Sequence, residues 1–96
     1  MEQVKAKKSL GQNFLKDPEV LRSIVEIAEI QAVDRILEIG PGTGALTEVL
    51  AATGAQVLAI ELDHQLVERL TQHFIESDNV SILEGNILDV HLEEFL

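Results

Sequence analysis

The chain has 96 residues, fewer than a typical domain of about 150, so we expect one compact unit and no second domain of ordinary size. Its apolar fraction of 46% and charged fraction of 25% are those of a folded soluble domain and exclude a disordered tail. The absence of cysteine excludes a disulfide framework, a thiolate metal site and a cysteine nucleophile, and the lack of tryptophan and tyrosine leaves no stacking platform for single-stranded bases.

The net charge of −10 is unevenly distributed along the chain. Residues 1–16 contain four lysines and one glutamate and carry +3, whereas residues 17–96 carry −13. On charge alone, the basic arm is either a solvated terminus or a contact with a nucleic acid. The sequence has no apolar run of membrane-spanning length and no cleavable leader, which predicts a cytoplasmic protein that does not bind a membrane.

A first helix is predicted to begin at Asp17, an N-cap residue followed by Pro18 at the first helical position. Apolar residues at helical spacing extend it to about residue 30. A short apolar run at residues 35–39 predicts a buried strand, and a glycine-rich turn follows at residues 40–44.

After this turn, apolar residues at helical spacing predict a second helix that ends at Gly54, which suits the left-handed C′ position. A second strand is predicted over residues 56–60, with Glu61 at its end. Asp63 is expected to cap a third helix. The apolar face of that helix is formed by Leu66, Leu70 and Phe74.

A third strand is predicted over residues 80–83, with a bend at residues 85–86 after it. Strands that alternate with helices, without hairpin signals, predict right-handed crossovers and an α/β fold with a Rossmann-type parallel sheet in the order 3-2-1. The predicted organisation is a basic arm at residues 1–16, followed by half of a doubly wound domain at residues 17–96. A further helix is expected to begin near residue 88.

Three glycines in five residues, Gly40, Gly42 and Gly44, exceed what a strand-to-helix turn needs, and indicate that the backbone approaches a ligand closely. Glu61 lies 21 residues after Gly40, at the end of the neighbouring strand. A carboxylate there can accept hydrogen bonds from both ribose hydroxyls of an adenosine-containing cofactor. The alternatives are a purely structural turn and an ordinary solvated glutamate.

Two features favour a methyl donor over a nicotinamide cofactor. Glu38, just before the glycines, is unfavourable beside a pyrophosphate but can reach the ammonium group of a methionine moiety, directly or through water. Residues 9–15 precede the first helix, outside the usual dinucleotide-binding unit, and their amides can close over the carboxylate end of such a cofactor.

Four segments together resemble the S-adenosylmethionine-dependent adenine dimethyltransferases of ribosomal RNA, above all the bacterial small-subunit enzymes, with the erythromycin-resistance methyltransferases as near relatives. These segments are residues 8–15 (KSLGQNFL), 37–47 (LEIGPGTGALT), 59–63 (AIELD) and 84–88 (EGNIL). The resemblance implies that the chain is the first half of a class I methyltransferase domain with S-adenosylmethionine as its cofactor. It also implies that the intact protein dimethylates adenine amines in small-subunit rRNA.

The resemblance implies a cofactor-binding set drawn from all four segments: Gln12, Asn13, Leu15, Glu38, Gly40, Gly42, Glu61, Leu62, Asn86 and Ile87. The first three bound the methionine end, the glycines line the cofactor with backbone, and the glutamate after the second strand holds the ribose. Asn86 stands where the family usually has aspartate, and its neutral carbonyl oxygen is a weaker acceptor for the adenine amine. The alternative for Asn86 is a simple turn residue, and Ile87 offers an apolar wall to the adenine ring.

The family's catalytic motif, Asn-(Leu or Ile)-Pro-Tyr, and its helical RNA-binding domain are absent from the 96 residues. Since an adenine amine is a poor nucleophile that needs positioned acceptors and an aromatic face, we assign no catalytic residue and expect no RNA methylation by this chain alone. The alternatives are an isolated cofactor-binding or folding module without catalysis and, less favoured, a nicotinamide-dependent oxidoreductase. The three histidines lack metal-ligand spacing, so no metal site is expected.

In a sheet of order 3-2-1, the first strand is an edge with backbone groups unpaired on one side. This edge and the apolar helix faces beside it favour self-association, and the expected partner is a second copy of the chain that pairs through the first strand or exchanges elements. The charge of −10 opposes association, but salt screens it beyond a Debye length of about 8 Å.

Overall fold

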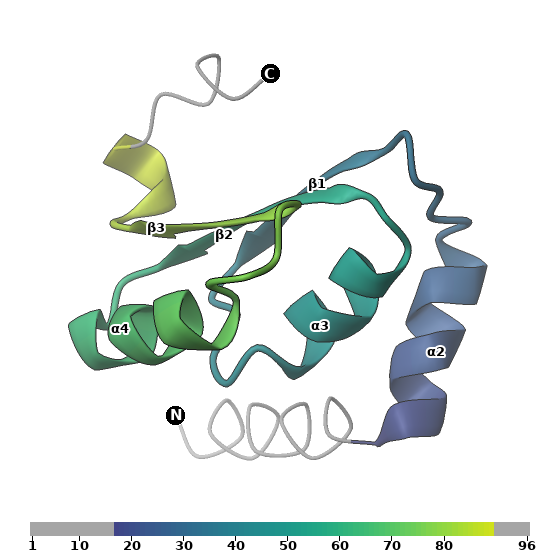
Figure 1. Ribbon diagram of the computed structural model, residues 1–96, viewed down its shortest axis with the longest axis horizontal. Helices are drawn as coiled ribbons and strands as arrows, with labels where there is room; N and C mark the ends of the chain where they lie inside the picture. The colour runs from purple at the N-terminus through teal and green to yellow at the C-terminus, as the bar shows by residue number, and fades with distance from the viewer. Residues whose placement is uncertain (1–16, 90–96) are drawn as a thin grey trace.

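The computed structural model describes residues 17–89, which form three α-helices and a three-stranded sheet (Figure 1). The elements in chain order are α2 (Pro18–Ile27), β1 (Arg35–Ile39), α3 (Ala45–Ala52), β2 (Gln56–Glu61), α4 (His64–His73), β3 (Val80–Glu84) and the 3-10 turn η1 (Ile87–Asp89). The arm at residues 1–16 and most of the helix expected near residue 88 lie outside the described residues.

All strand pairs are parallel, and β2 lies between β1 and β3. This is the predicted 3-2-1 sheet, and the predicted α/β class is confirmed. Arg35 pairs with Gln56 at the start of β1, and Val57 pairs with Val80 at the start of β3. Because the strands are parallel, the loops that follow them meet at one edge of the sheet, where a ligand site is expected.

The first helix is shorter than the sequence pattern predicts. Asp17 caps α2 as expected, its Oδ1 accepting a hydrogen bond from the Glu19 amide at 2.9 Å, but the helix ends at Ile27 and not near residue 30. Glu29 adopts a left-handed φ of 53°, its amide bonds the Glu26 carbonyl, and the Ile30 amide bonds the Val25 carbonyl. This is a Schellman ending with glutamate in the place usually taken by glycine, so no glycine marks the end of the helix.

Helices α3 and α4 lie together on one face of the sheet, and α2 stands beside α3 (Figure 1). The core on this face joins β2 to the two helices, and its members are less than 7% exposed: Leu50, Val57, Ala59, Leu70 and Phe74. Leu37 and Ile39 alternate with residues that face α3, so they lie on the opposite face, where they are 42% and 60% exposed. Among residues 17–89, no helix is long and apolar enough to cross a membrane.

Candidate functional site

The site is built on the carboxyl edge of the sheet. Two hydrogen bonds extend the strand ladder into the loops there, because the Gly40 amide donates to the Ile60 carbonyl at 2.8 Å and the Gly85 amide donates to the Glu61 carbonyl at 2.9 Å. The loops after β1 and β3 are thereby fixed to the end of β2. The glycine turn lies beside Glu61 as predicted, and the bend at residues 85–86 lies at the same edge.

The glycines of the first loop differ in what surrounds them. Gly40, Gly42 and Gly44 all adopt left-handed backbone, with φ of 68°, 59° and 88°. A Cβ on Gly44 would lie 2.8 Å from Leu70 Cδ2 and 3.1 Å from Phe74 Cε2, whereas one on Gly40 or Gly42 would meet no atom within 4 Å. Gly44 therefore allows α3 and α4 to pack closely, and the other two leave backbone open to an approaching ligand.

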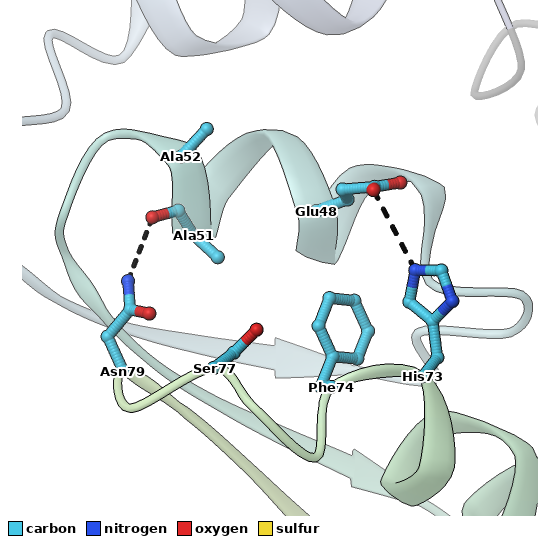
Figure 2. A pocket seen from close by; sticks show the side chains of 7 residues that line it. All are labelled: Glu48, Ala51, Ala52, His73, Phe74, Ser77 and Asn79. Atoms are coloured by element: carbon cyan, nitrogen blue, oxygen red, sulfur yellow. Dashed lines mark hydrogen bonds and ion pairs between the residues drawn. The ribbon is translucent and has the colours of Figure 1, made fainter.

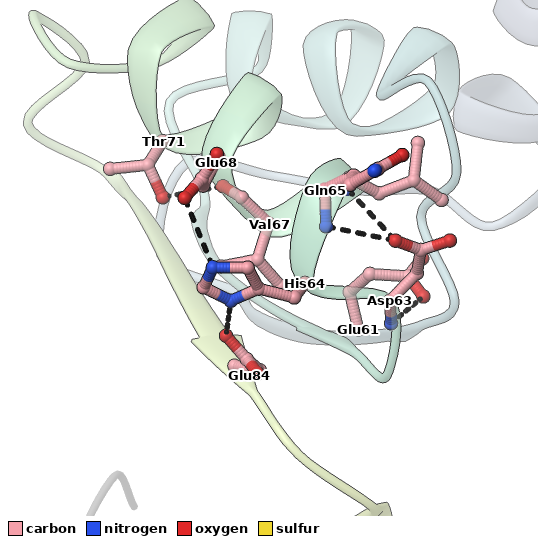
Figure 3. Close-up of polar contacts among 9 residues, drawn as sticks. Glu61, Asp63, His64, Gln65, Val67, Glu68, Thr71 and Glu84 are labelled. Carbon is pink, nitrogen blue, oxygen red and sulfur yellow. Dashed lines mark hydrogen bonds and ion pairs between the residues drawn. The ribbon is translucent and has the colours of Figure 1, made fainter.

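Glu61 joins the glycine loop to the start of α4. Its side chain is buried, with an exposure of 8%, and its Oε1 accepts a hydrogen bond from the Gly42 amide at 3.3 Å. Its Oε2 accepts from the Asp63 amide at 3.0 Å, a contact drawn in Figure 3. A carboxylate oxygen can accept more than one hydrogen bond, so Glu61 keeps acceptor capacity for a ligand hydroxyl. The spacing in the sequence predicted the proximity of Glu61 to the loop but not this direct bond.

Glu38 lies beneath the same loop and is half-buried. Burial raises the pKa of the Glu38 carboxyl above its usual value, and a hydrogen bond from the Thr47 hydroxyl to Glu38 Oε1 partly offsets this effect. Thr47 is fully buried in the first turn of α3. Sequence reasoning missed Thr47, because a threonine on a helix gives no signal that it bonds a neighbouring strand.

The other described members of the predicted set follow β2 and β3. Asn86 is exposed, and its Oδ1 accepts a hydrogen bond from the Leu88 amide at 2.9 Å, as a turn residue would, while a second lone pair stays available. Leu62 is 69% exposed at the end of β2, and Ile87 is half-buried at the start of η1. The residues predicted to bound the methionine end lie outside the described residues: Gln12, Asn13 and Leu15.

A histidine links α4 to β3 next to this edge (Figure 3). His64 Nδ1 lies 2.7 Å from Glu84 Oε1, and its Nε2 lies 3.0 Å from Glu68 Oε1. The hydrogen bond with Glu84, followed by the charges of both carboxylates, raises the pKa of His64. Among the described residues, no group of three or more acidic, histidine or cysteine side chains is arranged to hold a metal ion.

An open pocket of about 260 Å³ lies between α3 and the end of α4 (Figure 2). Glu48 and His73 face each other across it at 3.7 Å. Asn79, just before β3, donates from Nδ2 to the carbonyls of Ala51 at 2.8 Å and Ala55 at 2.9 Å. Because Asn79 precedes β3, this part of the pocket lies at the amino edge of the sheet, away from the glycine loop.

The model of the family described as ribosomal RNA adenine dimethylase matches residues 3–96. The chain belongs to the ribosomal RNA adenine dimethylase family. It is 50% identical over 93 residues to the ribosomal RNA small subunit methyltransferase A of Leuconostoc mesenteroides, covering 97% of this chain and 32% of that protein. It is 48% identical over 95 residues to the protein of the same name from Geobacter metallireducens, covering 99% of this chain and 34% of the relative.

The fold agrees with that of solved members of the wider group. The crystal structure of the 23S rRNA methyltransferase ErmE superposes with a TM-score of 0.71 and 31% identity, covering 78% of this chain and 31% of that one. The chain thus spans about a third of the length of the curated relatives it matches. The sequence resemblance to the rRNA dimethylase family is confirmed, and the nicotinamide-dependent alternative loses its support.

Proposed function

We propose that this chain supplies the S-adenosylmethionine-binding part of a methyltransferase that dimethylates adenine amines in small-subunit rRNA. Membership of the ribosomal RNA adenine dimethylase family supports the reaction and the RNA substrate. A ribosomal substrate in turn supports a cytoplasmic place of action. The cofactor supplies the methyl group, and the residues of this chain bind and orient it.

The observation that carries the proposal is the hydrogen bond between the Gly42 amide and Glu61 Oε1. It holds an open glycine backbone and a buried carboxylate side by side at the carboxyl edge of a parallel sheet. This arrangement supports a role for the carboxylate in binding two ribose hydroxyls, and Gly40 and Gly42 present no side chain that would exclude a ligand. Glu38, on the same face of the neighbouring strand, is proposed to attract the cationic end of the methionine moiety.

The remaining binding residues are proposed from the chain's membership of the family. Asn86 is proposed to accept a hydrogen bond from the adenine amine with the lone pair that the Leu88 amide does not use. Leu62 and Ile87 are proposed as apolar contacts of the adenine ring. Gln12, Asn13 and Leu15 are proposed to bound the methionine end.

Calorimetric titration of the 96-residue chain with S-adenosylhomocysteine and with NAD tests the cofactor. We expect binding of S-adenosylhomocysteine in preference to NAD. Glu61→Ala should weaken it by about 2–3 kcal/mol, or roughly 30- to 150-fold, because hydrogen bonds to a charged acceptor are lost. Glu84→Ala is the matched control, since Glu84 ends the next strand, is exposed and contacts His64 instead of the loop. Tighter binding of NAD, or equal effects of the two variants, would refute the cofactor assignment.

A module that binds the cofactor without catalysis is the second candidate for the chain in isolation. It is favoured by the absence of the Asn-(Leu or Ile)-Pro-Tyr motif from the 96 residues. We expect no transfer of labelled methyl groups from S-adenosylmethionine to small-subunit rRNA by this chain. Transfer above a control without protein would contradict this expectation.

A further inference from the structure

Among residues 17–89, Thr47 differs from the other helical hydroxyl residues in what it bonds. The hydroxyls of Ser23 and Thr71 donate to carbonyls four residues earlier in their own helices, at 2.9 and 2.7 Å, and Figure 3 shows Thr71 beside Val67. Such local bonds are the usual choice of a hydroxyl inside a helix. The Thr47 hydroxyl instead donates to Glu38 Oε1, on a different element. Its hydrogen bond is therefore available to fix a side chain of the site.

The burial of Thr47 prevents water from replacing its hydrogen bond with Glu38. Thr47 is 0% exposed, so its hydroxyl cannot turn to bulk water, and an apolar residue of the same shape would fill the space equally well. Within residues 17–89, no buried side-chain nitrogen or oxygen lacks a hydrogen-bond partner. Glu38 is the penultimate residue of β1 and Thr47 lies in the first turn of α3, so their bond joins the two elements that flank the glycine loop.

We propose that Thr47 is a positioning residue that holds the Glu38 carboxylate toward the ammonium group of the methionine moiety. The inference rests on the proposed function, because it assumes that the methionine end of the cofactor lies beside Glu38. A carboxylate attracts an ammonium group only while it is ionised, and burial works against ionisation. The donated hydrogen bond favours the ionised form and fixes one oxygen, which leaves the other free for the ligand.

The test compares two variants and two ligands. Thr47→Val keeps the shape and removes the hydroxyl, whereas Thr47→Ser keeps the hydroxyl. S-adenosylhomocysteine carries the ammonium group, and methylthioadenosine has the same nucleoside without it. At pH 7 we expect Thr47→Val to weaken S-adenosylhomocysteine binding by about tenfold and to leave methylthioadenosine binding unchanged, with Thr47→Ser close to the unsubstituted chain.

The pH dependence adds a second readout. The loss in Thr47→Val should be larger at pH 5.5 than at pH 8, because without the hydroxyl Glu38 becomes protonated at a higher pH. The other carboxyl groups near Glu38 are Glu61, on the same face of the neighbouring strand, and Glu48 and Asp63, on the elements beside it. Glu38→Gln therefore serves as the reference, since any pH dependence that it retains belongs to those other groups. Equal weakening of both ligands, or a Thr47→Ser variant as weak as Thr47→Val, would overturn the proposal.

A measurement without ligand separates this inference from the proposed function. A carbon-13 NMR titration of the Glu38 carboxyl should show its pKa rising in Thr47→Val and staying near the original value in Thr47→Ser. An unchanged pKa in Thr47→Val would overturn the inference. If the unsubstituted chain binds neither ligand while the pKa shift is found, the proposed function fails and the hold of Thr47 on Glu38 stands.

Discussion

Replacing Gly44 with alanine is expected to destabilise the fold much more than replacing Gly42 with alanine, although both residues have left-handed backbone. The two positions share the same conformational penalty, since their φ values are 88° and 59°. They differ in what a methyl group would meet. At Gly44 it would lie 2.8 Å from Leu70 and 3.1 Å from Phe74, and at Gly42 it would meet nothing within 4 Å.

The size of each effect follows from these contacts. Left-handed backbone costs a non-glycine residue about 1–2 kcal/mol, part of which is offset because alanine restricts the unfolded chain. Gly42→Ala should therefore lower the free energy of unfolding by about 1 kcal/mol. Leu70 and Phe74 are 1% and 6% exposed and cannot move aside freely, so Gly44→Ala adds an overpacking penalty of about 1–3 kcal/mol.

Urea unfolding followed by circular dichroism measures both free energies, and calorimetric titration with S-adenosylhomocysteine measures binding. For Gly42→Ala we expect the smaller loss of stability, about 1 kcal/mol, together with weakened binding, because the new methyl group enters space that is otherwise open. For Gly44→Ala we expect the larger loss of stability. Equal losses in the two variants, or a larger loss for Gly42→Ala, would refute the assignment of Gly44 to packing and of Gly42 to the ligand.

Three further predictions concern the carboxyl edge of the sheet and its outer strand β1. The pKa of His64 is raised, so its ion pair with Glu84 should stabilise the fold fully below about pH 6.5 and lose this effect as pH rises through the raised value. The difference in melting temperature between the unsubstituted chain and His64→Gln should then be present at pH 6 and absent at pH 9; a difference independent of pH would contradict the ion pair. Asn86→Asp should tighten S-adenosylhomocysteine binding in calorimetry, because a carboxylate is the stronger acceptor for the adenine amine, and unchanged binding would favour a turn residue alone. Sedimentation equilibrium should show a dimer of the 96-residue chain, because β1 is an edge of the described sheet with Ile39 60% exposed; a strictly monomeric folded species at high micromolar concentration would contradict this.

The fold could be predicted because each element carries its own local signal. Asp63 caps α4 as the sequence indicates, its Oδ1 accepting from the amides of Gln65 and Leu66. Gly54 has the left-handed φ of 89° expected at the end of α3. The end of α2 was missed because its left-handed residue is Glu29, and the Schellman hydrogen bonds that hold it are invisible in a residue pattern.

The candidate site could be predicted only in outline. Spacing placed Glu61 beside the glycine loop, because the ends of adjacent parallel strands lie together. The bond from Gly42 to Glu61 and the bond from Thr47 to Glu38 depend on side-chain rotamers and on the packing of α3, which no spacing specifies. The roles of the cofactor-binding residues remain predictions.

The order of the strands also bears on how the chain is assembled during synthesis. Each strand pairs with the one made just before it, so the sheet can grow outward from β1 as the polypeptide leaves the ribosome. At about 5–20 residues per second, successive strands about 20 residues apart emerge seconds apart, which leaves each strand that time to pair with its predecessor. No strand among the described residues must be inserted between two that are already paired. Residues 17–89 therefore have a topology suited to folding progressively, with each new strand finding its neighbour already formed.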